Sequence, residues 1–137
     1  MPRLVNIGTG EIVDRLTILA LKILYAGQQD KPVEHFTNEQ HALLVMLRGK
    51  TLNGVWFEHA VGLGAVNGAL WRVEDQMREL RNLPNGERAE WAGFGQTFNE
   101  RVVTTAFRIQ ELNDERARLV EAINKLTGDH LGSEKLT

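Results

Sequence analysis

The sequence predicts an all-α fold, a bundle of four main helices with a long C-terminal helix. Apolar residues recur at alternating spacings of three and four along most of the chain, which is the period of a helix with one buried face. Two threonine-led sequences, TNEQ at 37–40 and TFNE at 97–100, match the capping box that begins helices. Strand-like character is limited to a short extended piece at 4–7. The chain has 137 residues, so we expect a single domain over 1–137.

The first helix is expected to begin at Gly10 or Glu11 and to end at Gly27, because glycine is a common stop signal after the last helical residue. Thr9 is placed to cap its amino end, and Glu11 lies favourably in the first turn. The glycine turn before the helix also presents backbone N–H groups to an anion, although Glu11 counts against phosphate there. The residues expected to face the core are Ile12, Leu16, Leu19, Ala20 and Ile23.

The second and third helices are separated by less regular sequence. A polar loop at 27–36 precedes the second helix, which is expected to start at the capping box of Thr37 and to run to about Lys50. The third helix covers 56–81, although three glycines in its first half weaken it by about 1 kcal/mol each relative to alanine. Its apolar stripe consists of Val66, Leu70, Val73, Met77 and Leu80.

The last helix has the most regular pattern in the sequence. It is expected to begin after the capping box at Thr97 and to stop at Gly128. At 1.5 Å per residue it is roughly 45 Å long. Its seam is typical of a long helix that packs against its neighbours at a shallow angle. The seam consists of Phe98, Val102, Thr105, Ile109, Leu112, Arg116, Leu119, Ile123 and Leu126.

Composition excludes several classes of protein. A formal net charge of −2 argues against a partner that is a nucleic acid polymer, which would call for a basic excess. The sequence has no cysteine, which excludes disulfides and thiolate metal sites. Charged residues interrupt the apolar runs before they reach the pattern of a signal peptide or the length of a membrane span. We therefore expect a cytoplasmic protein with no membrane contact.

Arg116 is the first polar anomaly, because it occupies a core position in the seam of the last helix. An arginine buried without a partner is costly, so its guanidinium must reach either solvent or a carboxylate. We expect it to lie within salt-bridge distance of at least one acid on the first or third helix. The candidate partners are Glu74, Asp75, Glu11 and Asp14.

The first and third helices also mix charged residues with apolar ones. On the first helix, Glu11, Arg15 and Lys22 fall within about 40° of one another, opposite the core stripe. On the third helix, Trp71 lies in a polar stripe with Asn67. A pocket shared by the first, third and last helices would give these charges partners. Trp71 would then form a wall of the pocket, with a flat face for a ring or a cation.

These features predict a small-molecule binding protein and leave open whether it is an enzyme. Lysine and arginine suit an anionic group such as phosphate, and Trp71 would stack on a base or sugar ring. A nucleotide or nucleotide-sugar fits best. The acids would bind ligand hydroxyls or hold a divalent ion, Mg²⁺ or Mn²⁺. The predicted ligand-binding residues are Glu11, Asp14, Lys22, Asn67, Trp71, Glu74, Asp75, Asn113 and Arg116.

Two alternatives stay open. Acids at 11 and 14 and at 111 and 114, if they faced one another, would suit a metal-dependent phosphohydrolase. Alternatively, the buried charges only set the packing register of a structural or protein-interaction module. The long seam exceeds what short helices in a small domain easily cover, so the sequence also predicts a homodimer.

Four segments have a familiar order and spacing: GEIVDRLTILALK at 10–22, VNGALWRVEDQMRE at 66–79, NDERARLVEAIN at 113–124 and SEK at 133–135. Together they resemble an uncharacterised family of small proteins, domain of unknown function 6165, whereas residues 27–60 show no such likeness. The family has no established activity, so the resemblance implies where a site lies and leaves its chemistry open. The positions that the family pattern emphasises are Glu11, Asp14, Arg15, Thr17, Lys22, Asn67, Trp71, Glu74, Asp75, Arg78, Asn113, Asp114, Arg116 and Asn124.

Overall fold

A computed structural model describes residues 7–50, 52–90 and 97–129, and all regular structure in these ranges is helical. The helices are α1 (Thr9–Gln28), α2 (Glu34–Leu47), α3 (Gly54–Arg81), α4 (Asn85–Glu90) and α5 (Phe98–Thr127). The predicted all-α class and the long C-terminal helix are confirmed. Residues 4–6 of the predicted extended piece and the SEK motif lie outside the described ranges. Within those ranges, no helix is both long enough and apolar enough to cross a membrane.

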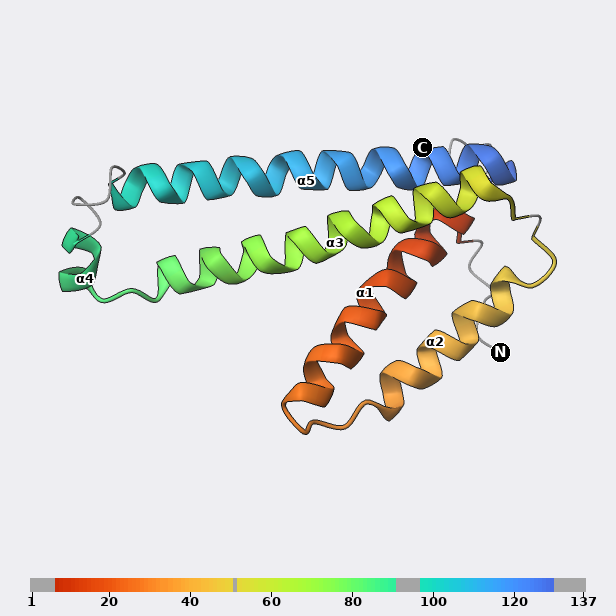
Figure 1. Cartoon of the computed structure of the whole chain (residues 1–137), viewed down its shortest axis with the longest axis horizontal. Helices are drawn as coiled ribbons and strands as arrows, with labels where there is room; N and C mark the ends of the chain where they lie inside the picture. Colours follow the sequence, from red (N-terminus) through yellow and green to blue (C-terminus); the bar gives the residue numbers. More distant parts are fainter. Residues whose placement is uncertain (1–6, 51, 91–96, 130–137) are drawn as a thin grey trace.

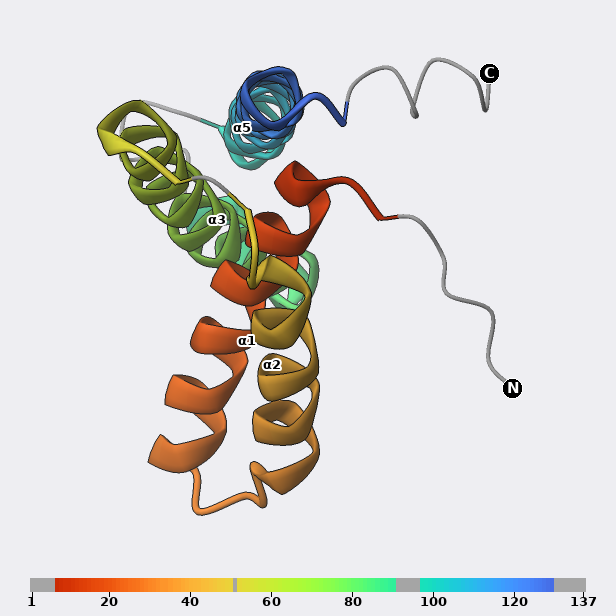
Figure 2. The ribbon, with the colours of Figure 1, turned by 90° about the vertical axis from the view of Figure 1, so that its right-hand side faces the viewer.

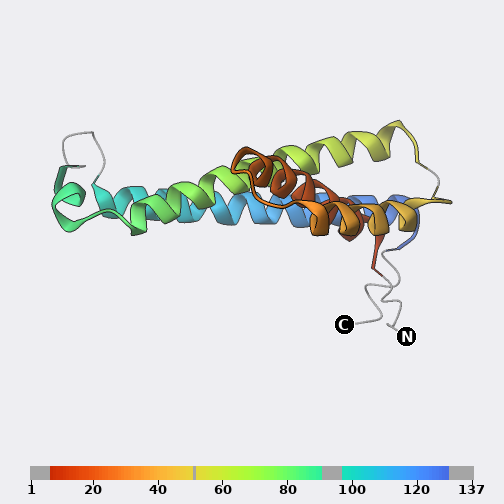
Figure 3. The same cartoon turned by 90° about the horizontal axis from the view of Figure 1, so that it is seen from below.

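The molecule consists of a long helix pair and a shorter hairpin. Helices α3 and α5 run side by side in opposite directions, with α4 at the end where the chain passes between them (Figure 1). The α1–α2 hairpin leaves this pair at an angle and lies beside only one half of its length (Figures 1 and 3). Helix α1 packs against both α3 and α5, whereas the main contact of α2 is with α1. Helix α1 therefore joins the two parts.

Two separate apolar clusters hold these parts together. Val13, Leu63, Leu119 and Ile123 connect α1, α3 and α5, and each of them is at most 5% exposed. A second cluster, Ile12, Leu19 and Leu43, connects α1 and α2. Full burial of each such side chain stabilises the fold by about 1.5–3 kcal/mol. Because α1 contributes to both clusters, its polar side chains lie where the two parts meet.

The predicted apolar stripes are largely confirmed. On α3, Leu70, Met77 and Leu80 are buried, and most of the α5 seam is buried or partly buried. Two residues of the predicted stripes are exposed instead, Ala20 on α1 and Leu126 on α5. The prediction for Ala20 is wrong because α1 is covered on two sides only, by the long pair and by α2.

The ends of α5 match the sequence signals. The Thr97 hydroxyl accepts a hydrogen bond from the Glu100 N–H at 3.1 Å, as in a capping box. Gly128 ends the helix with a left-handed backbone, φ 79°, which glycine adopts without steric cost. Both signals are local, and both are confirmed.

The ends of α1 and α2 differ from the prediction. Helix α2 begins at Glu34, three residues before the expected start, so Thr37 lies inside the helix. Its hydroxyl donates to the Val33 carbonyl and does not cap the helix. Helix α1 continues one residue past Gly27. Thr9 is already helical and caps nothing, because its side chain and N–H donate to Asp129. Helix α3 starts at Gly54, where the Asn53 side chain accepts from the Trp56 N–H at 2.9 Å.

A glycine brings the start of α1 into contact with α5. A Cβ atom at Gly10 would lie 2.2 Å from the backbone oxygen of Val120, far closer than any real contact. Only glycine therefore allows the two helices to approach this closely. The approach places the next acids of α1, Glu11 and Asp14, against α5.

Candidate functional site

Asp14 of α1 and Arg116 of α5 form a two-pronged ion pair. Arg116 donates from Nε to Asp14 Oδ1 at 2.8 Å and from Nη2 to Oδ2 at 2.6 Å. The Asp14 side chain is only 14% exposed. Hydrogen bonding to Asp14 raises the pKa of Arg116 against the opposing effect of burial, and the charges of Asp14 and Glu74 add to the rise. The prediction that Arg116 reaches a carboxylate is confirmed.

Asn67 of α3 joins the same network. Its side-chain amide donates to Asp14 Oδ1 at 2.8 Å and to Thr17 Oγ1 at 2.7 Å. The Thr17 hydroxyl donates in turn to the backbone carbonyl of Asp14 at 2.7 Å. Asn67 is 4% exposed, and a buried amide needs such partners. Asp14 is therefore the point where α1, α3 and α5 are linked by polar contacts.

A second polar contact ties α1 to α5 one turn earlier. The buried Asn124 side chain donates to both carboxylate oxygens of Glu11 at 3.0 Å and accepts from the Gly10 N–H at 2.7 Å. The Thr9 N–H is bonded to Asp129 at 2.9 Å. The backbone N–H groups of Thr9 and Gly10, which the sequence offered to an anion, thus already have acceptors within the protein.

Asp129 links the start of α1 to the end of α5 through hydrogen bonds. Its carboxylate accepts from Thr9 and from the Thr127 hydroxyl, and Lys50 Nζ lies 3.8 Å from it. Burial acts to raise the pKa of Asp129. The hydrogen bonds from Thr9 and Thr127 and the charge of Lys50 outweigh that effect, so the pKa falls below its ordinary value.

Three predicted site residues lie apart from this network. Glu74 and Asn113 are exposed, and Asp75 pairs with Arg78 on the surface of α3. Asp75 and Asn113 line neither of the two cavities beside α1, and Glu74 approaches the network only through its charge. The acid pairs at 11 and 14 and at 111 and 114 are not assembled into one group. Among the described residues, no three His, Asp or Glu side chains are grouped so as to hold a metal ion.

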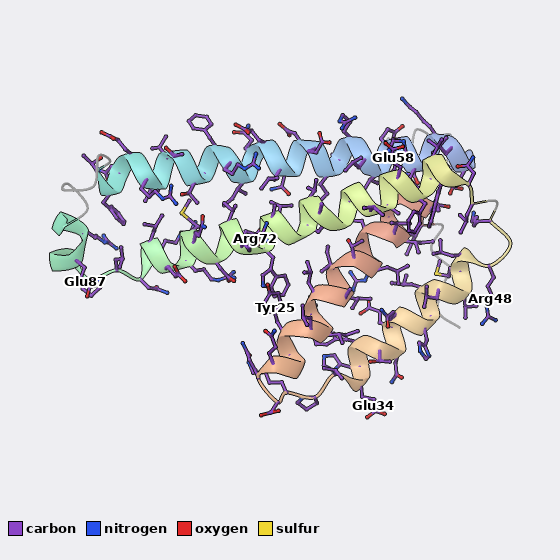
Figure 4. All side chains as sticks on the ribbon, in the orientation of Figure 1. Tyr25, Glu34, Arg48, Glu58, Arg72 and Glu87 are labelled. Carbon is purple, nitrogen blue, oxygen red and sulfur yellow. The ribbon has the colours of Figure 1, made fainter. Side chains whose placement is uncertain are left out.

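Trp71 and Lys22 line an open cavity of about 630 Å³ at the hairpin, here named the aromatic cavity. Trp71 stacks against Tyr25, with ring centroids 5.1 Å apart and ring planes 5° from parallel. Figure 4 shows Tyr25 pointing from α1 toward α3. Lys22 Nζ lies 5.7 Å from the centre of the Phe36 ring, within the range of a cation–π contact. Lys31 and His35 complete the charged or titratable part of its described lining, which contains no carboxylate.

A second cavity of about 300 Å³, here named the polar cavity, lies nearer the amino end of α1. Its lining includes five charged residues of the predicted polar sectors: Glu11, Asp14, Arg15, Lys22 and Arg116. Arg15 also pairs with Glu39 of α2. Lys22 lines both cavities, which therefore adjoin at this side chain.

The sequence did not point to Lys31, His35 and Phe36 as site residues. These residues lie in the loop after α1 and in the first turn of α2, so no helical periodicity connects them with Trp71. The one available signal was Tyr25, which lies three residues after Lys22 in the same sector of the helix.

The chain matches no family model, no curated protein and no solved structure. The resemblance to domain of unknown function 6165 therefore stays a prediction. The geometry of the two cavities is what supports a function.

Proposed function

We propose that this protein binds a small anionic ligand that carries a flat ring, with a nucleotide or nucleotide-sugar as the favoured class. The aromatic cavity is the observation on which the proposal rests, because it combines three aromatic rings with two lysines, and its described lining residues include no carboxylate. Its volume of about 630 Å³ is within the range of small-molecule pockets. A cleft lined by one sign of charge attracts the opposite charge.

Each part of such a ligand has a counterpart in the two cavities. A base would pack against the Trp71 and Tyr25 pair, since aromatic faces suit ring systems. Phosphate oxygens would accept from Lys22 and Lys31. A sugar would extend past Lys22 into the polar cavity, where Arg116 and Glu11 offer a donor and an acceptor. A nucleotide-sugar would use both cavities, and a nucleotide would use the first.

Binding is tested directly by a thermal-shift screen followed by calorimetric titration. The probes are inorganic phosphate, ADP, UDP and UDP-glucose, each with and without Mg²⁺ or Mn²⁺. A ligand that binds only the folded state raises the melting temperature. We expect the nucleotides to exceed phosphate, because phosphate alone gains nothing from the rings. A screen in which no nucleotide binds more tightly than phosphate contradicts the proposal.

Lys22→Met is the sharpest probe of the aromatic cavity. It keeps the side-chain stem and removes the charge, so we expect nucleotide affinity to fall by roughly 1.5–3 kcal/mol, the value of a hydrogen bond to a charged group. The folded protein should keep or gain stability, because binding sites often trade stability for function. The matched control is Lys125→Met, an exposed lysine on α5 that lines neither cavity. A lower melting temperature with unchanged affinity would show that Lys22 is structural.

The alternative of a purely structural role is favoured by a separate observation. Both oxygens of Asp14 and both oxygens of Glu11 already have partners within the chain. A network satisfied in this way needs no ligand, and it sets the register of three helices. We therefore assign the two roles to neighbouring parts of the molecule. The Asp14 and Glu11 network has the structural role, and the aromatic cavity is the proposed binding site.

Several predictions from the sequence remain as proposals beside this one. A metal-dependent phosphohydrolase would need ligands beyond the acids that the described residues assemble. We further propose a single domain, a bundle of four main helices and a cytoplasmic location.

A further inference from the structure

We propose that the outer face of α3 is a dimer interface, which pairs with the same face of a second copy in the antiparallel direction. The inference is independent of the proposed function. The outer face is defined as Glu58, Val61, Ala65, Gly68 and Arg72, at successive spacings of three, four, three and four. This is the period of a helix seam that packs along another helix.

The outer face of α3 is free of the other described helices. The opposite side of α3 carries Leu63, Asn67 and Leu70, each buried against α1 or α5. In Figure 2, α1 and α5 lie on one side of α3 and no drawn helix covers the other. Val61 is 56% exposed and the adjacent Phe57 is 64% exposed. An apolar patch of this kind on a soluble domain is characteristic of an interaction site.

Gly68 has no explanation within a single copy. A Cβ atom added there would meet no atom within 4 Å, so the described fold does not require glycine. Glycine inside a helix nevertheless costs about 1 kcal/mol relative to alanine. Together with Ala65 it makes the centre of the outer face flat, which allows a second helix to approach closely.

The charges at the two ends of the outer face indicate that its partner is a second copy of this chain. Glu58 and Arg72 each lie seven residues from Ala65, on opposite sides of it. Figure 4 shows the two side chains well separated along α3. Both are exposed, and neither forms an ion pair with another described residue. A two-fold axis through Ala65 places each Glu58 opposite the Arg72 of the other copy.

A second copy in this orientation gains two ion pairs, whereas a parallel copy would place like charges together. Self-complementarity about a two-fold axis is the defining property of a homodimer interface. The predicted dimer thus belongs to α3. The α5 seam, from which the sequence predicted it, is covered by α3 along the long pair. One helix pair is a small interface, so we expect a dissociation constant in the micromolar range.

A single cysteine at the two-fold axis tests the geometry. The chain contains no cysteine, so Ala65→Cys introduces the only thiol. Two copies related by the axis bring their thiols together, and mild oxidation at tens of micromolar protein should convert most of the chain to a disulfide dimer. The matched control, Ala117→Cys, places a thiol at an exposed alanine of α5 and should cross-link slowly. Equal rates for the two variants would overturn the proposal.

Charge reversal tests the orientation and the partner. We expect Glu58→Arg and Arg72→Glu each to weaken the dimer about ten-fold in sedimentation equilibrium, which is about 1.4 kcal/mol. The double variant restores opposite charges across the axis and should recover the original dissociation constant. Circular dichroism checks that each variant keeps its helices. A chain that stays monomeric, a dimer indifferent to the single reversals, or a double variant without recovery would each overturn the proposal.

Discussion

Asp14 links α1 to both α3 and α5 through its carboxylate. Its carboxylate accepts two hydrogen bonds from Arg116 and one from Asn67, on two different helices. A carboxylate this buried would be strongly unfavourable alone, and the guanidinium fork matches its geometry. The charge pair thus fixes the packing register of α1 against α3 and α5.

Asp14→Asn should therefore destabilise the protein by about 2 kcal/mol. The change leaves the Arg116 charge without its counter-ion, and that loss is reduced because the Arg116 side chain is 34% exposed. Asp75→Asn is the matched control, since Asp75 pairs with Arg78 on the surface and should cost less than about 0.5 kcal/mol. Urea unfolding measures both variants. Equal losses would show that the Asp14 network does not hold the helices together.

Sequence periodicity could place part of this network and not the rest. The position of a residue in the chain fixes its angle about its own helix. This angle correctly predicted that Arg116, Asp14 and Asn67 lie in one region. Glu74 lies two turns beyond Asn67 on nearly the same side of α3, yet it is exposed. Helix α1 diverges from α3 toward its carboxyl end (Figure 1). The point at which two helices diverge is set by their crossing angle. That angle depends on both helices, so the periodicity of one helix does not determine it.

Helix ends show the same division between local and tertiary control. Thr97 caps α5 through a hydrogen bond between its hydroxyl and an N–H three residues later. This bond forms within one turn and requires no contact with another helix. The similar sequence at Thr37 fails because α2 starts earlier. The earlier start brings Phe36 into the helix, where it packs on the Ile12, Leu19 and Leu43 cluster. Apolar burial of an aromatic side chain is worth more than one cap.

The contact between the start of α1 and α5 depends on one missing side chain. Gly10→Ala would place a Cβ 2.2 Å from the Val120 carbonyl oxygen, and backbone on both sides must move. We expect a loss of about 3 kcal/mol, at the upper end for overpacking. Gly27→Ala is the control in the same helix, where a Cβ meets nothing within 4 Å, and it should gain stability. Two variants with the same urea midpoint would contradict the close contact.

The whole molecule divides into a long helix pair and a hairpin of lower expected stability. Helix α2 has its main contact with α1 alone, and only Leu43 within it is buried. Segments with few buried apolar contacts open locally at lower free energy than the rest of a protein. The aromatic cavity lies at this hairpin and reaches α3 through Trp71. A ligand in it would touch both parts at once.

Hydrogen exchange should report this division and its coupling to binding. Without ligand, we expect the amides of α2 to exchange faster than those of α3 and α5, because α2 opens without unfolding the long pair. Saturating nucleotide should slow exchange most in the loop after α1 and in the first turns of α2, since binding to the closed form adds its free energy to every opening there. Lys22→Met should lose most of that added protection and keep the ligand-free pattern. Ligand protection confined to α5, or α2 amides as slow as those of α3, would show that the hairpin neither opens separately nor binds.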